Sequence, residues 1–280
     1  MTTFLLPLTI PSIGKNKIKT LIRKRSFERD GFVISDRLID VDLIARSRTH
    51  IQQIMAGEYE TGKVPGYPTV PAEIVTEEPT TLYRLYQPHL ADNTIRKLVT
   101  QPALGLFAAS LWDTNWIQLW GVTFLYKPKD VAEKGNIGWH QDHHYFTNIW
   151  QPDSEVFFMS LAISDVNSNM GPVLMIRGSH KWGYLAQGDF YEQDMEAIRQ
   201  KIDAPAGAQW EEVPITMPAG AVSCHHQNTF HGSVGNQSGE PRLSILLELR
   251  TKRSTPIPGS ESYYVQHLDD DETSPIIYAG

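Results

Sequence analysis

Three residues with metal-binding side chains, and an arginine shortly after the last of them, stand out in this sequence. His140 and Asp142 are separated by one residue, His231 lies far downstream, and Arg242 follows it. In a β-strand, residues two positions apart point to the same side, so His140 and Asp142 can share one metal ion. Two imidazoles and one carboxylate on one face of Fe(II) leave its other face open for a cosubstrate and O2. The sequence therefore predicts an iron centre. His140, Asp142 and His231 are its expected metal ligands and are also the expected catalytic residues.

The cysteine content limits the alternatives for this site. A structural zinc site normally has four protein ligands, usually cysteines, whereas the chain contains only Cys224. One cysteine excludes a cysteine-rich zinc site and an internal disulfide, and it favours a reducing compartment. We expect Cys224 to be a small buried residue in a strand. His225 and His226 are alternative ligands, but neither is followed by the Gly-Ser and Arg pattern that follows His231.

Arg242 indicates which cosubstrate the iron centre uses. Residues 232–241 are rich in Gly, Ser and Asn and predict a turn, after which Arg242 opens the apolar strand Leu243–Leu249. A hairpin of this length would return Arg242 to the neighbourhood of the metal. Its guanidinium group can hold a carboxylate with two parallel hydrogen bonds, which suits a dicarboxylic 2-oxoacid whose other end chelates iron. A surface ion pair is the alternative role for this arginine.

Several further pieces of the sequence resemble the phytanoyl-CoA dioxygenase family of Fe(II)- and 2-oxoglutarate-dependent oxygenases. The resemblance extends from about residue 26 to about residue 250, and it is much more specific than His-x-Asp alone. One departure is Arg177 before Gly178, where family members commonly have proline. The matching pieces are Phe27–Phe32, Trp139–Asp142, Gly171, Gly178–Lys181, His231–Ser233, Asn236, Ser238 and Arg242.

The resemblance implies a double-stranded β-helix, which is a mainly β, cupin-like jelly roll with flanking helices. It implies iron ligation by His140, Asp142 and His231. It also implies that 2-oxoglutarate is bound by Arg242, with Ser233 as a hydroxyl partner. Fe(II), 2-oxoglutarate and O2 are therefore the expected cofactor and cosubstrates.

Two further expectations follow from the resemblance. Gln118, on the strand before the metal motif, is an additional cosubstrate residue. Related halogenases replace the carboxylate ligand with a small residue, so the presence of Asp142 favours hydroxylation of an unactivated C–H bond, with desaturation or ring formation as other outcomes. The protein's part in such chemistry is to position that bond and exclude wasteful reactions.

Substrate contacts are predicted from residues near the motif. Trp139 and Tyr145 are candidate pocket residues, with ordinary packing as the alternative. Alternation places His144 on the side of His140 if the strand continues that far, and an ordinary hydrogen-bonded histidine is the alternative. Arg84 lies on a predicted edge strand that reaches the pocket.

These contacts do not identify the substrate, because one fold serves many substrates. We expect a small polar molecule, such as a guanidinium alkaloid of the cylindrospermopsin type within secondary metabolism. The alternatives are hydroxylation of an acyl-CoA or amino-acid derivative, a non-oxygenase metal-dependent isomerase, and a binding protein on the same scaffold.

The elements that must position these residues form one domain over 1–280. Apolar spacing and proline positions predict helices from Asp40 to about Met55 and from Asn93 to about Leu111, with a break at Pro102. Short β-type runs follow, at Trp116–Tyr126, Val156–Ile163, Val173–Ile176, Ala221–Cys224 and Leu243–Leu249, which suggests a β-sandwich or jelly roll. We expect an N-terminal arm at 1–25, candidate lid segments at 57–79 and 187–212, and a C-terminal tail at 254–280. A second His-x-Asp, at His267, adjoins the acidic run Asp269–Glu272, which we expect to be solvated.

Charge and hydropathy limit the classes of partner that we expect for this protein. The net charge is −7 and no basic block opposes it, so nucleic acid is not an expected partner. No stretch approaches the roughly 18 uncharged residues of a membrane span. Basic residues follow the N-terminal apolar run instead of preceding it, which is the wrong order for a signal peptide. We expect a cytoplasmic protein with a small-molecule substrate and no membrane partner; the sequence does not predict the oligomeric state.

Overall fold

Two β-sheets form the centre of the molecule. The computed structural model describes residues 15–67, 70–75, 77–131 and 135–280. The strands of the large sheet are β1 (Phe32–Ile34), β4 (Tyr83–Tyr86), β5 (Trp116–Lys127), β7 (Val156–Ala162), β10 (Val222–His226), β12 (Arg242–Arg250) and β13 (Ile276–Ala279). The small sheet contains β6 (Ile137–His140), β8 (Val173–Ile176), β9 (Glu212–Pro214) and β11 (His231–Ser233), and β2 (Gly66–Tyr67) pairs separately with β3 (Val70–Pro71).

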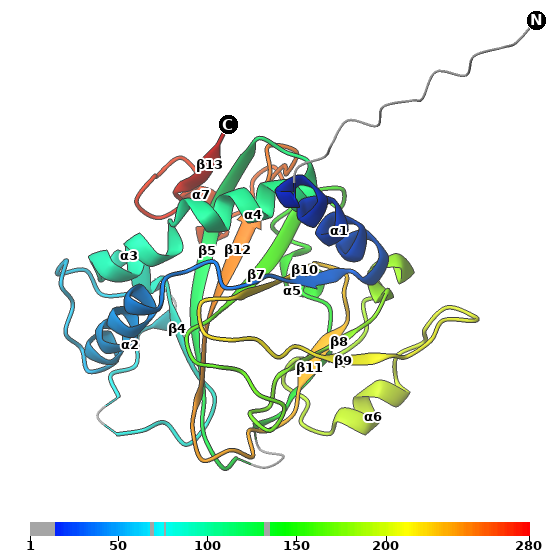
Figure 1. Ribbon diagram of the computed structural model, residues 1–280, viewed down its shortest axis with the longest axis horizontal. Coiled ribbons are helices and arrows are strands. Elements are labelled where there is room, and N and C mark those ends of the chain that lie inside the picture. Colours follow the sequence, from blue (N-terminus) through cyan, green and yellow to red (C-terminus); the bar gives the residue numbers. More distant parts are fainter. Residues whose placement is uncertain (1–14, 68–69, 76, 132–134) are drawn as a thin grey trace, which may run out of the picture.

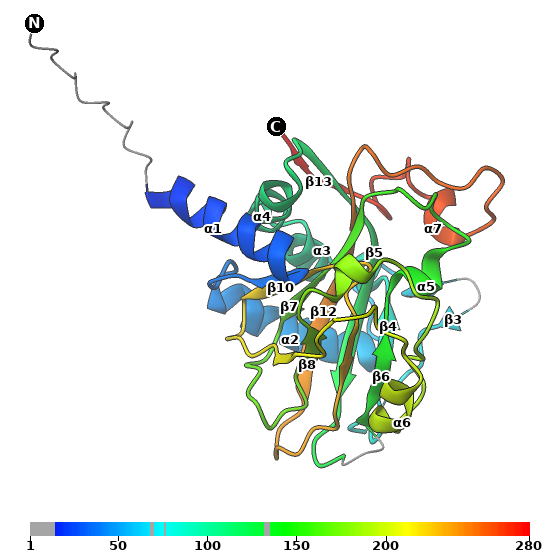
Figure 2. The same cartoon turned by 90° about the vertical axis from the view of Figure 1, so that its right-hand side faces the viewer.

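The strand order defines a jelly roll. The large sheet has the order β1-β10-β7-β12-β5-β13, with β4 also paired to β5, and the small sheet has the order β6-β11-β8-β9. The small sheet lies on one side of the large sheet and most helices lie on the other (Figures 1 and 2). This mainly β arrangement with flanking helices is the predicted fold class.

The helices begin where the sequence supplies caps. They are α1 (Lys15–Asp30), α2 (Val41–Met55), α3 (Asn93–Val99), α4 (Pro102–Trp112), α5 (His143–Phe146), α6 (Met195–Gln200) and α7 (Tyr263–Gln266), with short 3-10 turns at Pro88–Leu90 and Ser179–Trp182. The Asp40 carboxylate accepts a hydrogen bond from Asp42 N, and the Asp92 carboxylate accepts one from Ile95 N, both at 2.9 Å. Pro102 lies in the first turn of α4, where its missing N–H costs nothing. The predicted helices and their break at Pro102 are therefore confirmed.

The two faces of β12 have different environments. Leucine and isoleucine at every second position pack into the core that the large sheet shares with α2, α3 and α4. These residues are Leu243, Ile245, Leu247 and Leu249. The alternate residues, from Arg242 to Glu248, point to the opposite face because side chains in a strand alternate. That inner face looks toward the small sheet and carries the polar side chains of the site.

Both chain ends differ from the predictions. Residues 15–25, predicted as part of an arm, belong to α1, whereas residues 1–14 lie outside the described residues. Residues 254–280, predicted as a tail, contain α7 and then β13, which pairs with β5. The acidic run Asp269–Glu272 is exposed, whereas apolar residues of β13 such as Ile277 are buried against the sheet and α4.

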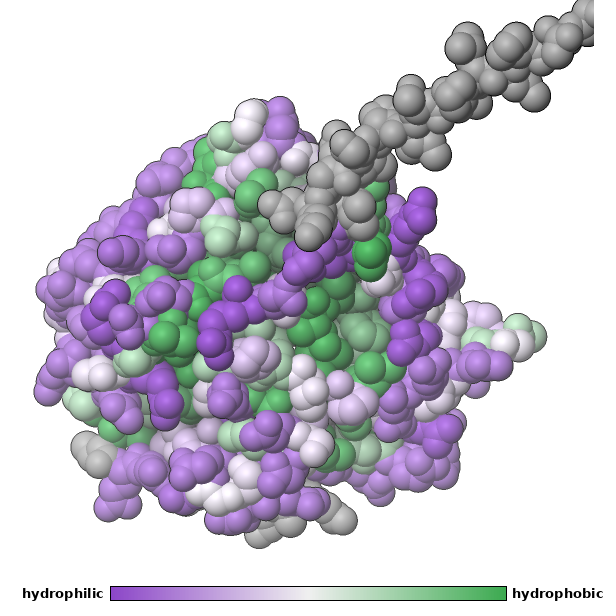
Figure 3. Space-filling model, viewed as in Figure 1, coloured by the Kyte–Doolittle hydropathy of each residue, from purple (hydrophilic) through white to green (hydrophobic). Residues whose placement is uncertain are grey.

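Hydrophilic and hydrophobic residues occupy different parts of the molecular surface. On the face shown in Figure 3, hydrophilic residues cover most of the periphery and hydrophobic residues gather nearer the middle. Within the described ranges, no helix is both long enough and apolar enough to cross a membrane.

Candidate metal centre and substrate pocket

The two sheets bring the predicted metal ligands together. β11 pairs with β6 in an antiparallel register that places His231 opposite His140. Asp142 Oδ1 lies 3.6 Å from His140 Nε2 and 3.7 Å from His231 Nε2. The three residues are buried, and their ligand atoms lie within 4.8 Å of one another. One metal ion can therefore contact all three side chains.

Backbone carbonyl groups orient both imidazoles. His140 Nδ1 donates to Gly138 O at 2.8 Å, and His231 Nδ1 donates to Thr229 O at 3.0 Å. A proton on each Nδ1 leaves each Nε2 with a lone pair that faces Asp142. Burial and then the nearby His140 lower the pKa of His231 to about 3. The His231 imidazole is therefore neutral at pH 7, as a metal ligand must be.

Asp142 is held from its other side by a histidine of the large sheet. His225 Nε2 lies 2.8 Å from Asp142 Oδ2, which leaves Oδ1 toward the two ligand histidines. Burial raises the pKa of the Asp142 carboxyl, but the neighbouring histidines, first His231 and then His140 and His225, lower it by more. Asp142 is thus a carboxylate at neutral pH. His225, weighed above as an alternative ligand, contacts the ligand carboxylate and lies outside the three-residue group.

The strand that carries His140 ends at that residue. Asp142 precedes the short helix α5 and has helical backbone angles, φ −58° and ψ −33°. The alternation that was expected to carry His144 toward the metal therefore stops. Gln141 lies outside the three-residue group, and its buried amide group donates to Gly183 O and Asn228 O at 2.8 and 2.7 Å. These bonds fasten the turn that carries Asp142 to two neighbouring loops.

Arg242 is buried and has a cationic neighbour that sequence analysis did not identify. The β5–β12 register places Arg242 opposite Lys127, and both side chains are almost inaccessible to solvent. Within the described part of the chain, no acceptor reaches Arg242 Nε and no carboxylate pairs with either cation. Burial, followed by the charge of Arg242, lowers the pKa of Lys127 to about 6, and burial lowers the pKa of Arg242 to about 10. These two buried basic groups, here called the cation pair because a bound anion favours the charged form of both, form a site suited to a carboxylate.

Ser233 and Gln118 lie in different places relative to this cation pair. Ser233 Oγ accepts a hydrogen bond from Lys127 Nζ at 2.6 Å, so the structure brings Ser233 to the cation pair. Gln118 lies opposite Arg250, at the other end of β12, about 27 Å from Arg242 at the usual strand rise. Its amide group is already bonded to Leu268 O, Ser274 O and Arg250 Nε. The structure therefore does not bring Gln118 to the cation pair.

A cavity of about 240 Å³ opens beside the triad. His140 and Asp142 line it on the side of the small sheet. The inner face of the large sheet contributes Glu248 and other residues of β4, β5 and β12. Its aromatic walls are formed by Tyr145, Phe146, Phe158, Phe190, Tyr191 and Tyr264. Segment 187–212, predicted as a candidate lid, thus supplies two wall residues.

Two of the four predicted substrate residues line this cavity. They are Arg84 and Tyr145. Trp139 does not, because it precedes His140 in β6 and so faces the opposite side, where it packs with Ile176 and Phe230. His144 does not line it either; its Nδ1 bonds to the Tyr184 hydroxyl group at 2.9 Å.

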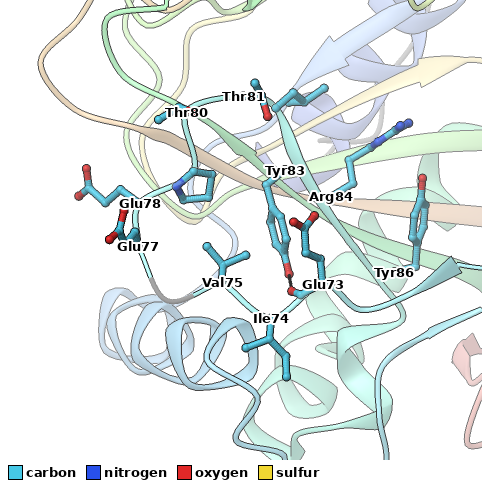
Figure 4. A pocket seen from close by; sticks show the side chains of 12 residues that line it. Glu73, Ile74, Val75, Glu77, Glu78, Thr80, Thr81, Tyr83, Arg84 and Tyr86 are labelled. Carbon is cyan, nitrogen blue, oxygen red and sulfur yellow. Dashed lines mark hydrogen bonds between the residues drawn. The ribbon is translucent and has the colours of Figure 1, made fainter.

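A second pocket adjoins this cavity at β4 (Figure 4). Arg84 and Tyr86 line both pockets. Tyr83 lines only the second pocket, and its hydroxyl group donates to Glu73 O at 2.9 Å (Figure 4). The rest of this pocket is formed by the described part of segment 57–79, the other candidate lid, and by Thr80–Leu82. That segment therefore borders the approach to Arg84.

A jelly roll with a buried group of two histidines and one carboxylate is the architecture of the non-haem iron oxygenases. Residues 27–244 match the family model for phytanoyl-CoA dioxygenase, and the chain belongs to this family. It is therefore a 2-oxoglutarate-dependent non-haem iron dioxygenase, and Fe(II), 2-oxoglutarate and O2 are its cofactor and cosubstrates. The family and cofactor predictions are confirmed.

Individual relatives are distant. Ectoine dioxygenase of Bordetella bronchiseptica is 22% identical over 246 residues, which cover 82% of this chain and 75% of the relative. The carbocyclase SnoK from nogalamycin biosynthesis has a TM-score of 0.66 at 17% identity, covering 95% of this chain and 96% of that chain. The epimerase SnoN, solved with Fe3+, alpha ketoglutarate and nogalamycin RO, has a TM-score of 0.65 at 19% identity, covering 88% of this chain and 92% of that chain. At these identities the structural neighbours support the fold.

Proposed function

We propose that this enzyme hydroxylates an aliphatic C–H bond of a small polar molecule. In this proposal His140, Asp142 and His231 hold Fe(II). Arg242 and Lys127 hold the far carboxylate of 2-oxoglutarate, and Ser233 completes that site. The substrate class we favour is a polar secondary metabolite, with guanidinium alkaloids of the cylindrospermopsin type as one example.

The buried cation pair is the observation that carries this proposal. Burying two adjacent basic groups is costly, because each must stay charged without a partner or give up its proton, and a bound anion would compensate both. A dicarboxylate provides one carboxylate for Arg242 and Lys127 and keeps its 2-oxoacid end for the metal. The donor set of two imidazoles and one carboxylate suits Fe(II) and leaves positions for that chelate.

The chain's own residues then have distinct tasks. When bound, iron and 2-oxoglutarate supply O2 activation, and one turnover converts R–H, O2 and 2-oxoglutarate into R–OH, succinate and CO2. His225 holds Asp142 Oδ2 and keeps Oδ1 directed to the metal. The aromatic walls exclude water and orient the substrate, with Arg84 and Tyr145 as contacts.

The size of the cavity supports a small substrate over an acyl-CoA thioester. A volume of about 240 Å³ accommodates a compact molecule or the reacting end of a larger one. SnoK is a carbocyclase and SnoN is an epimerase, so ring formation and epimerisation are known outcomes on this fold. Measuring product mass separates these outcomes, because hydroxylation adds one oxygen atom and the other two outcomes do not.

The first experiment is anaerobic addition of Fe(II) and 2-oxoglutarate, followed by visible spectroscopy. We expect the weak charge-transfer band of an iron chelate in the wild-type enzyme, saturating with 2-oxoglutarate. Arg242→Ala should need a much higher 2-oxoglutarate concentration for the same band. Bound iron without any band would overturn the proposal and favour a metal-dependent isomerase or a binding protein. A band in the wild type makes succinate release the assay for a substrate screen.

A further inference from the structure

A buried carboxyl group lies in the cavity wall where the proposed chemistry does not need one. Glu248 is on the inner face of β12, six residues after Arg242, and only 4% of its surface is exposed. Among the described residues, no hydrogen-bond donor reaches its Oε2 atom, and no basic side chain forms an ion pair with it. The Tyr264 side chain provides its one hydrogen bond. Glu248 thus retains an acceptor that the protein itself leaves unpaired.

The surrounding backbone makes room for this carboxyl group. Gly121 of β5 lies directly opposite Glu248. A Cβ atom at position 121 would overlap Glu248 Oε2 and crowd the Tyr264 ring. The glycine therefore permits a conformation in which the carboxyl group reaches the cavity beside His140 and Asp142.

The environment of Glu248 favours the charged carboxylate only when a cation lies beside it. Burial and then the negative charge of Asp142 raise the pKa of Glu248 to about 8. A cation beside the carboxylate would offset both effects. The strand register also separates this end of the cavity from Arg84. Arg84 lies opposite Leu125, which lies opposite Ser244, four residues before Glu248. With usual strand spacings, Arg84 and Glu248 are about 16 Å apart, so Arg84 does not occupy the place of that cation.

We propose that Glu248 is the specificity-determining residue of this enzyme and binds a cationic nitrogen, an amine or a guanidinium group, of the substrate. This inference rests on the proposed function, because it concerns the substrate of the same metal site. A charged N–H group held by the Glu248 carboxylate positions the neighbouring carbon atoms over the metal ligands that line the same cavity. Neutral molecules of the same shape leave the buried carboxyl group without a charged partner and bind more weakly.

Butylguanidinium and its neutral isostere butylurea test this inference. The two probes have nearly the same shape and differ in charge. Calorimetric titration into the wild-type enzyme, loaded anaerobically with Fe(II) and 2-oxoglutarate, should show at least about tenfold tighter binding of butylguanidinium. Glu248→Gln keeps the size of the side chain and its hydrogen bonding, and it should remove the preference. Glu248→Asp keeps the charge and should retain part of it.

Three outcomes contradict the inference. They are equal binding of the two probes by the wild type, an unchanged preference in Glu248→Gln, and loss of the preference in Glu248→Asp as complete as in Glu248→Gln. Melting temperature and the 2-oxoglutarate chelate band, unchanged in both variants, show that the fold and the metal site are intact. If the wild type lacks the chelate band, the proposed function fails. The probe preference is then still measured on the protein without 2-oxoglutarate, so the two failures are distinguishable.

Discussion

Asp30 and Glu248 are both buried acids, and the protein treats them in opposite ways. Asp30, at the end of α1, accepts hydrogen bonds from Arg29 Nε and Nη2 at 2.8 and 2.7 Å and pairs with Arg177 Nη1 at 2.7 Å. Hydrogen bonding to Arg29 and the ion pair with Arg177 hold the pKa of Asp30 below its usual value, against a smaller opposing effect of burial. Glu248 has no basic partner among the described residues, and its pKa is raised to about 8.

The difference separates a charged cluster that is complete within the protein from ionisable groups that have no counter-charge in the described part of the chain. Around Asp30 the chain supplies each charge with its counter-charge, so the cluster is complete in the protein alone. Along the inner face of β12 it does not: among the described residues, Arg242 and Lys127 have no acidic partner, and Glu248 has no basic one. Such groups are costly to bury whether they stay charged or become neutral, and they are candidates for ligand binding.

Removing a metal ligand should have the largest effect. His231→Ala should lower 2-oxoglutarate turnover by more than about 100-fold, because altering even the partners of metal ligands changes affinity or activity by 10- to 100-fold. Succinate release and bound iron measure the effect. His267→Ala, in the other His-x-Asp sequence, is the matched control and should keep normal turnover. Near-normal turnover in His231→Ala would mean that the ligands are misassigned.

Removing Arg242 should have the next largest effect. Two charge-assisted hydrogen bonds contribute about 1.5–3 kcal/mol each, so Arg242→Ala should raise the half-saturating 2-oxoglutarate concentration by at least about 100-fold. Arg242→Lys keeps the charge but loses the two-pronged geometry, and it should be intermediate. An unchanged concentration dependence in Arg242→Ala would remove this residue from the cosubstrate site.

Lys127 should make cosubstrate binding depend on pH. Its lowered pKa of about 6 leaves it mostly neutral at pH 7 in the free enzyme, whereas a bound carboxylate favours its charged form. Binding then takes up a proton, so 2-oxoglutarate affinity should fall by up to about tenfold per pH unit as the pH rises above 6. Titrations between pH 6 and 8 measure this slope, and Lys127→Met should flatten it. A flat wild-type profile would show that Lys127 does not titrate on binding.

Removing the charge of Asp30 should have the smallest effect on activity. Asp30→Asn should lower the free energy of unfolding by about 1–2 kcal/mol, with partial screening because its arginine partners are partly exposed. The folded-state pKa of Asp30 is below its unfolded value, so this contribution is present above about pH 4 and disappears as the pH falls through the folded-state pKa. Denaturant unfolding measures it. If Asp30→Asn also changed the half-saturating 2-oxoglutarate concentration, Asp30 would not differ from Arg242 in the way proposed here.

Part of the site and much of the fold could be predicted from the sequence because they depend on local rules. Apolar spacing and caps such as Asp40 and Asp92 place helices within a residue or two. The metal motif is recognisable because two ligands lie two residues apart and the spacing that follows His231 returns Arg242 to the inner face. Local rules failed where an element stops: β6 ends at His140, so alternation could not place His144.

The sequence by itself determined which residue types are available for iron and for a carboxylate. Only the tertiary structure decided the partners of the buried charges, because partnership depends on strand register and not on distance along the chain. The pairing of β5 with β12 brings Lys127 to Arg242, Gly121 to Glu248 and Gln118 to the opposite end. A hint was present in the sequence, since Glu248 interrupts an apolar strand. Its environment, and the absence of a basic partner among the described residues, depend on how the two sheets pack.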